Sequence, residues 1–89
     1  MFEWDEDKNR INSAKHGLDF SAVKHFAWHE AVLFDRSRPE DGEQRYAAIG
    51  MFDGKLHTVI FTRPSKKRTR IISFRRSNKS EEEAYEENT

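Results

Sequence analysis

The sequence predicts an α+β domain in which two N-terminal helices precede a four-stranded antiparallel sheet and one helix closes the chain. Three observations support this prediction. A polar, helix-compatible stretch ends at Gly17, four segments rich in β-branched and aromatic residues follow, and the chain ends in a run of glutamates. The connections between the four segments are short, and short connections favour strands that pair in sequence order as an antiparallel meander.

The two helices are expected over residues 5–15 and 22–30. The first is polar and ends before Gly17, with Lys15 and His16 in its last turn, where cations interact favourably with the helix dipole. Ser21 is a suitable N-cap for the second helix, because its hydroxyl can accept from a free backbone N–H.

The four strands are expected over residues 31–35, 44–52, 55–63 and 69–76. Asp53-Gly54 between the second and third strands is a strong signal for a two-residue hairpin turn. The segments 36–43 and 64–68 contain Pro or Gly and are expected to be a loop and a turn. Ser77 and Ser80 can each cap the final helix, and Ser80 with Glu83 has the spacing of a capping box.

The composition limits the possible functions. The 89 residues are expected to form one domain, 1–89, and the absence of cysteine excludes disulfides, thiolate nucleophiles and thiolate metal sites. No signal peptide or membrane-spanning run is visible, so we expect a cytoplasmic protein that makes no membrane contact. His25 and His29 lie four residues apart without an evident third ligand, and we therefore expect no metal and no cofactor.

The net charge of zero hides an uneven distribution. Residues 63–79 contain eight Lys and Arg and no acidic residue, whereas residues 80–89 contain five Glu and no base. Such a basic segment is consistent with a surface that faces a polyanion. The alternative is a solvated hairpin whose cations pair with the glutamates that follow, and the charge distribution alone leaves both open.

Strand alternation assigns the side chains of the basic segment to faces. Two sets are expected on opposite faces of the last strand: Arg70, Ile72, Phe74 and Arg76 on one, and Ile71, Ser73 and Arg75 on the other. Helices are expected to cover one face of the sheet and leave the other as a concave basic surface suited to RNA, rimmed by Arg45, Arg63 and either Arg75 or Arg76. His57 is expected to be solvated beside the hairpin turn.

Three separated motifs resemble a known family. The first is "FEWD" with Lys8, Asn12, "KHG" and Phe20; the second is Glu43, Arg45, Tyr46, Ile49 and Gly50; the third is "RIIS" with Arg75, Arg76, Glu81 and Tyr85. Together they cover most of the chain and resemble the BrnT family of type II toxins, ribonucleases related in fold to RelE and ParE toxins. Phe74 and Ser80 depart from the family pattern, in which alanine and a basic residue are usual.

This resemblance implies a RelE/ParE-like fold and a metal-independent endoribonuclease that inhibits translation. It also implies neutralisation by a BrnA-like antitoxin with a ribbon-helix-helix domain, through which most contact with operator DNA would be made. Two other functions remain open: a co-repressor or partner-binding module with weak catalysis, or a ParE-like toxin that acts on gyrase.

The candidate catalytic residues are Lys15, His16, Glu43, Arg70, Arg75 and Arg76. The candidate RNA-binding residues are Arg45, Arg63, Lys66, Lys67, Arg68 and Tyr85. Arginine can stabilise the charge that develops when a 2′-OH attacks the phosphate, and His16 is the preferred acid or base. Structural roles compete with several of these: ion pairs with the glutamates of the last helix for Arg70, Arg75 and Arg76, helix capping for Lys15 and His16, an ion pair between Glu43 and Arg45, and packing for Tyr85.

Overall fold

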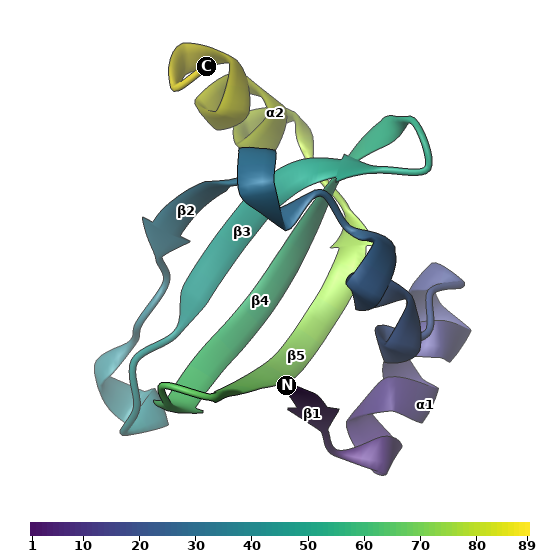
Figure 1. Ribbon diagram of the computed structural model, residues 1–89, viewed down its shortest axis with the longest axis vertical. Coiled ribbons are helices and arrows are strands. Elements are labelled where there is room, and N and C mark those ends of the chain that lie inside the picture. The colour runs from purple at the N-terminus through teal and green to yellow at the C-terminus, as the bar shows by residue number, and fades with distance from the viewer.

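The computed structural model describes all residues 1–89 and places a single twisted sheet at the centre of the chain (Figure 1). Along the chain the strands are β1 Phe2–Trp4, β2 Val32–Asp35, β3 Tyr46–Phe52, β4 Lys55–Ser65 and β5 Arg68–Arg76. The α-helices are α1 Glu6–His16 and α2 Lys79–Glu87. Three short 3₁₀ helices lie between α1 and β3: η1 Phe20–His25, η2 Trp28–Glu30 and η3 Pro39–Asp41.

The sheet has five strands in the order β1-β5-β4-β3-β2, and it is mixed. The antiparallel meander from β2 to β5 is present, but β1 adds a parallel edge strand in which Phe2 is opposite Thr69 and Trp4 is opposite Ile71. The predicted four-stranded antiparallel sheet is therefore wrong by one strand. A three-residue strand beside an acidic helix start has no alternating pattern long enough to be detected from sequence.

The structure also differs from the prediction at the second expected helix, residues 22–30. Residues 20–25 form a 3₁₀ helix capped by Asp19, not by Ser21, and a second short turn follows at Trp28. Phe20 and Val23 from this segment are fully buried, so tertiary packing rather than helix propensity fixes it. The first helix was predicted to within one residue, and Gly17 ends it in the left-handed conformation with φ 70°.

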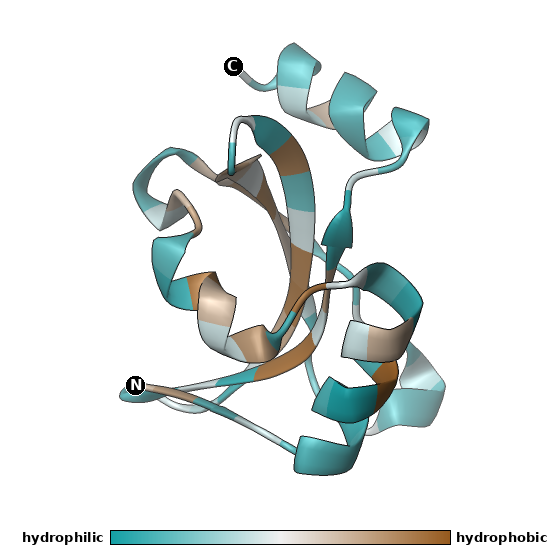
Figure 2. Cartoon of the chain, turned by 90° about the vertical axis from the view of Figure 1, so that its right-hand side faces the viewer, coloured by the Kyte–Doolittle hydropathy of each residue, from teal (hydrophilic) through white to brown (hydrophobic).

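The final helix begins with a capping box made by Asn78 and Glu81, not by Ser80 and Glu83. The Asn78 side chain accepts from the backbone N–H of Glu81 at 2.8 Å, and the Glu81 carboxylate accepts from the N–H of Asn78 at 2.9 Å. α2 stands at one end of the sheet and is mostly hydrophilic in sequence (Figures 1 and 2).

The main core lies on the sheet face covered by η1 and η2, with α1 packed against β5. Its fully or almost fully buried hydrophobic residues are Phe20, Val23, Phe26, Ala48, Val59, Phe61, Ile71 and Phe74. His57 belongs to the same face and is only 4 % exposed, between the rings of Phe52 and Phe74. The expectation that His57 is solvated is therefore wrong, because the long β4 continues past the hairpin as part of the packed sheet.

A β-bulge in β5 changes which side chains share a face. Val59 is opposite Phe74, Ile60 is opposite Ser73, and Phe61 is opposite Ile71, so one extra residue of β5 lies in this interval. Ile71 and Phe74 consequently both face the core, although strict alternation had placed them on opposite faces. The bulge leaves Arg70 and Arg75 on the same outer face, opposite Thr62 and Thr58 respectively.

Candidate functional site

An arginine-lined hollow lies on the outer face of the sheet, away from the main core. It has a volume of about 440 Å³, and Ile60 of β4 contributes to its lining. Asp35 and Ser37 also line it, and four arginines surround it: Arg36 and Arg38 from the β2–β3 connection, Arg45 immediately before β3, and Arg75 from β5. We call this hollow, defined by Ile60 and these four residues, the arginine trough.

Antiparallel pairing explains why two of these arginines meet. The backbone N–H of Arg36 donates to the carbonyl of Arg45 at 2.8 Å, which extends the β2–β3 ladder by one pair beyond Asp35 and Tyr46. Residues paired in this way point to the same face of a sheet. Arg36 and Arg45, which are nine residues apart in the sequence, therefore lie side by side at the edge of the trough.

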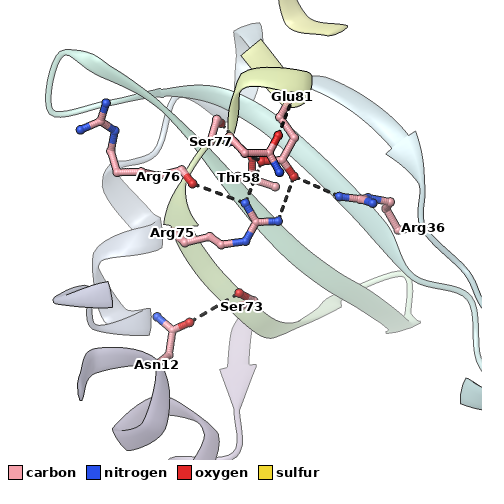
Figure 3. Close-up of polar contacts among 9 residues, drawn as sticks. Asn12, Arg36, Thr58, Ser73, Arg75, Arg76, Ser77 and Glu81 are labelled. Atoms are coloured by element: carbon pink, nitrogen blue, oxygen red, sulfur yellow. Dashed lines mark hydrogen bonds and ion pairs between the residues drawn. The ribbon is translucent and has the colours of Figure 1, made fainter. Parts of the chain in front are cut away.

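Glu81 of α2 joins Arg36 and Arg75 at one side of the trough (Figure 3). Arg75 binds its carboxylate in a bidentate arrangement, with Nη1–Oε1 and Nη2–Oε2 distances of 2.7 and 2.9 Å. Nη2 of Arg36 donates to Oε2 at 3.0 Å, and the hydroxyl of Thr58 donates to Oε1, also at 3.0 Å. One buried carboxylate therefore holds two guanidinium groups next to each other.

The charge of Glu81 is stabilised by these contacts. Burial is the largest single influence and acts to raise the pKa of the carboxyl. Hydrogen bonds from Arg75, from the N–H of Asn78 and from Thr58, together with the charge of Arg75, outweigh it and lower the pKa to about 2. Glu81 is thus ionised at neutral pH and is a poor proton acceptor, which suits it to positioning arginines rather than to base catalysis.

Arg45 also lines the trough, and its contacts within the chain are longer. Its Nε lies 3.5 Å from Oδ2 of Asp41 and its Nη2 lies 3.8 Å from Oε1 of Glu43, distances of ion pairs rather than of hydrogen bonds. The Nε atom is buried and makes no hydrogen bond within the chain. A buried guanidinium N–H without a partner can donate to an oxygen of a bound ligand.

Arg45 also lines a second hollow of about 400 Å³ that contains Glu43 and Arg70. Arg70 and Arg68 both bind Glu3 of β1, with Nε–carboxylate distances of 2.9 and 2.7 Å. The hydrogen bond from Arg68 is the main cause that lowers the pKa of Glu3 to about 2, and Arg70 adds to it. The predicted alternative, an ion pair with a glutamate of the last helix, is present for Arg75 with Glu81, whereas Arg70 pairs with Glu3 of β1.

His16 lies at the C-terminal end of α1, which packs against β5. Burial lowers the pKa of its imidazole below the usual 6.5, and the charges of Lys15 and Arg75 lower it further. His16 lines none of the described hollows, and its link to the trough is the charge of Arg75. A histidine with a lowered pKa is neutral at pH 7 and can accept a proton.

Other predicted residues lie outside the trough. Arg63 and Lys66 line a hollow on the opposite face of the sheet with Tyr46 and Phe61. Arg76 extends away from Glu81 (Figure 3), although its backbone carbonyl accepts from Arg75 at 3.4 Å. Lys67 lies in the β4–β5 turn, and Tyr85 is half-buried on α2.

Arg36 and Arg38 were not among the predicted site residues. Their segment reads "RSRPEDGE" and was interpreted only as a loop. The available signal was the position of Arg36 immediately after a strand, where hairpin pairing places it beside Arg45. Arg38 is held by Asp41 of η3, with two nitrogen–oxygen distances of 3.0 and 2.9 Å.

Two further observations concern metals and membranes. No group of three or more His, Asp or Glu side chains is arranged to hold a metal ion. No helix is both long and apolar enough to cross a bilayer.

Comparisons with known proteins agree with the sequence motifs. The family described as "Ribonuclease toxin, BrnT, of type II toxin-antitoxin system" matches residues 4–81. Among solved structures, the Brucella abortus ribonuclease toxin BrnT, determined at 1.1 Å resolution, is similar with a TM-score of 0.69 and 32% sequence identity. The match covers 89% of this chain and 99% of the Brucella chain. No curated protein sequence matches.

The family match extends from Trp4, the last residue of β1, into the first turn of α2, and it includes every residue that lines the arginine trough. The structural match covers nearly the whole of the Brucella toxin at an identity that shows common descent. The chain therefore belongs to the BrnT family of ribonuclease toxins of type II toxin–antitoxin systems.

Proposed function

We propose that this protein is a metal-independent endoribonuclease that inhibits translation and holds its RNA substrate in the arginine trough. The observation that carries the proposal is the convergence of Arg36, Arg45 and Arg75 on one hollow of the outer sheet face. Guanidinium groups bind phosphate through paired N–H donors and keep their charge at all physiological pH values. The family assignment supplies the reaction class, and the hollow supplies a place for a phosphodiester.

In the proposed reaction the 2′-OH of a ribose attacks the adjacent phosphorus and its proton passes to a base. The bond to the 5′-oxygen breaks, and that oxygen receives a proton, which leaves a 2′,3′-cyclic phosphate and a 5′-hydroxyl. The trough arginines would stabilise the additional negative charge of the phosphorane, which is the step where fixed positive charge is most effective. Because strands and Glu81 hold the guanidinium groups in place, little reorganisation is needed.

The proposed base is His16, with Glu43 as the other candidate. His16 is neutral at pH 7 and near Arg75, whereas Glu43 lies in the hollow next to Arg45 and Arg70. Glu81 is not proposed as the base, because it already accepts hydrogen bonds from Arg36, Arg75, Thr58 and the N–H of Asn78.

The wider system is also part of the proposal. We infer a single cytoplasmic toxin domain, 1–89, of RelE/ParE-like architecture, neutralised by a BrnA-like ribbon-helix-helix antitoxin that makes most of the contact with operator DNA. The support is the family assignment together with an antiparallel meander flanked by α1 and α2.

A second candidate function is a partner-binding module with weak catalysis. It is favoured by the ion pairs of Arg70 with Glu3 and of Arg75 with Glu81, which satisfy two of the predicted phosphate contacts internally. The two functions differ in whether the free chain cleaves RNA.

The experiment is cleavage of a 5′-labelled RNA by the purified, partner-free chain in excess EDTA, with and without ribosomes. Arg45→Ala is compared with Arg10→Ala, a matched control because Arg10 is exposed on α1 and pairs only with neighbouring Asp7. We expect wild type and Arg10→Ala to cleave, and Arg45→Ala to lose about 10²-fold, as for removal of one oxyanion donor. A folded wild-type chain that leaves RNA intact under both conditions would favour the binding module, and cleavage abolished by EDTA would contradict metal independence.

A further inference from the structure

The hollow that contains Arg63 and Lys66 has a volume of about 440 Å³ and lies on the opposite face of the sheet from the arginine trough. Leu33 of β2, Tyr46 of β3 and Phe61 of β4 supply apolar surface, and Arg63, Ser65 and Lys66 complete its lining. We call it the aromatic hollow. Tyr46 and Phe61 follow Arg45 and Ile60 directly in the chain, so strand alternation turns them to the opposite side of the sheet from the trough.

The aromatic hollow is part of a longer row of rings. Tyr46 stacks on Phe61 with ring centroids 5.5 Å apart, Phe61 meets Trp28 edge-on at 5.5 Å, and Trp28 stacks on Phe2, also at 5.5 Å. Leu33, at one end of this row, is 59% exposed although it is a strand residue. Aromatic side chains with an exposed aliphatic neighbour and nearby arginine have the composition of protein–protein interfaces.

The charges at this hollow have one sign. Arg63 and Lys66 are its only ionisable cations, and no carboxylate lines it. The Nη2 of Arg63 donates to the carbonyl of Lys66 at 2.6 Å, which holds the two residues together at the end of the β4–β5 hairpin. An occupant would therefore need an apolar side chain for the floor and an acidic group for the rim.

We propose that the aromatic hollow is the docking site for the antitoxin, through a segment that presents an apolar side chain next to Asp or Glu. The chain's family supplies a protein partner, and the hollow supplies an apolar floor that a ribose-phosphate backbone does not need. The lining of the trough, by contrast, has one apolar residue, four arginines, Ser37 and the carboxylate of Asp35. The inference rests on the toxin assignment but not on ribonuclease activity.

One consequence is that antitoxin docking and RNA contact are separable by mutation. The two hollows occupy opposite faces of β3 and β4, and no residue lines both. The antitoxin would then neutralise the toxin through additional segments that extend from this anchor, rather than through the anchor alone.

The test uses the full-length cognate antitoxin as the probe and measures its dissociation constant for the full-length toxin by biolayer interferometry. The variant is Leu33→Asp, which introduces a carboxylate at an exposed position of the floor. Ile11→Asp is the matched control, because Ile11 is an exposed apolar residue of α1 at 66% exposure and lines none of the described hollows. Circular dichroism and thermal unfolding establish that both variants fold.

We expect Leu33→Asp to weaken antitoxin binding at least tenfold, with RNA cleavage by the free variant unchanged, and Ile11→Asp to change neither. Arg63→Ala, measured for antitoxin binding only, should weaken it and reduce its dependence on salt. Unchanged antitoxin binding by folded Leu33→Asp and Arg63→Ala would overturn the proposal. Loss of RNA cleavage in folded Leu33→Asp with antitoxin binding intact would instead assign the hollow to RNA.

The RNA cleavage assay tests the proposed ribonuclease activity independently of the docking site. If the wild type does not cleave RNA but Leu33→Asp still weakens antitoxin binding, the proposed docking site is supported and only the proposed ribonuclease activity is wrong.

Discussion

Glu81 and Arg75 form a bidentate ion pair that joins α2 to β5, with nitrogen–oxygen distances of 2.7 and 2.9 Å. The same carboxylate caps its own helix through the N–H of Asn78. α2 is short and polar, and it stands at one end of the sheet. This one residue therefore starts the helix, attaches it to the sheet and fixes a trough arginine.

The first prediction concerns Glu81 and acid stability. Its folded-state pKa is about 2 and its ordinary value is 4.5, so the unfolded state binds more protons between these values. The contribution of Glu81 to stability is fully present above about pH 4.5 and is lost as the pH falls toward 2. We expect Glu81→Gln to unfold more easily at pH 7 by about 1–3 kcal/mol, because Arg75 loses its buried partner.

The measurement is urea unfolding followed by circular dichroism from pH 7 to pH 3. The difference in unfolding free energy between wild type and Glu81→Gln should shrink as the pH falls below 4.5. Glu83→Gln, on an exposed position of the same helix, is the control. A difference that stays constant down to pH 3 would show that Glu81 does not carry this pH dependence.

The second prediction concerns the geometry of Arg75. Arg75→Lys keeps the positive charge but removes the planar pair of N–H donors that binds Glu81. We expect RNA cleavage to fall by about 10²-fold despite the retained charge, because the position of the charge is lost. Single-turnover cleavage rates measure this, with Arg10→Lys as control. Equal rates for Arg75→Lys and wild type would mean that net charge, not geometry, is required.

The topology of the middle of the chain was predictable because its signals are local. The Asp53-Gly54 turn and the alternating segments on either side fix the β3–β4 hairpin, and Gly17 fixes the end of α1. Two features were not predictable for the opposite reason. β1 is defined by its pairing with Thr69 to Ile71, far away in sequence, and the bulge in β5 reverses side-chain alternation without any special residue type.

The difference between local and long-range signals also explains which residues of the arginine trough could be predicted from sequence. Arg45 and Arg75 were identified from sequence because they lie at the ends of expected strands and in the family motifs, although alternation left the choice between Arg75 and Arg76 open. Arg36 was missed because its role depends on the pairing with Arg45 and on the carboxylate of Glu81, a residue 45 positions away. Arg63 and Lys66 lie on the sheet face that carries Tyr46 and Phe61, and they are therefore separated from the trough. This separation could not be predicted from sequence, because it depends on the register of the strands.

The third prediction concerns His16 as the proposed base. Burial, Lys15 and Arg75 disfavour its protonated form, so the imidazole is neutral at pH 7 and becomes charged only below its usual pKa of 6.5. We expect the cleavage rate to be constant above this pH and to fall tenfold per pH unit below the lowered pKa. His16→Gln should lower the rate and remove this acid limb.

The measurement is a pH–rate profile under single-turnover conditions, with thermal unfolding to confirm that each protein is folded at each pH. His29→Gln is the control, since His29 is on η2 and outside the trough. If His16→Gln retains the acid limb, the base is another group, and Glu43→Gln is the next variant to measure.

The fourth prediction concerns Asn12, which attaches α1 to the edge of β5 beyond the end of β1. Its side-chain amide donates to the carbonyl of Phe74 at 2.8 Å and accepts from the N–H of Phe74 at 3.2 Å, so it replaces a neighbouring strand at this position. It also contacts Ser73 (Figure 3). We expect Asn12→Ala to destabilise the fold by about 3 kcal/mol, because backbone groups of a fully buried residue lose their partners.

For a domain of this size, such a change should lower Tm by more than about 10 °C. Asn12→Asp tests the mechanism, because it keeps an acceptor for the N–H of Phe74 but places a second oxygen against the carbonyl. It should also be destabilising, although it is nearly isosteric. Ser13→Ala removes only a partly exposed bond to Leu18 and should cost less than about 1 kcal/mol. Similar Tm values for Asn12→Ala and Ser13→Ala would mean that β5 is held by its strand neighbours alone and that α1 contributes only its apolar contacts.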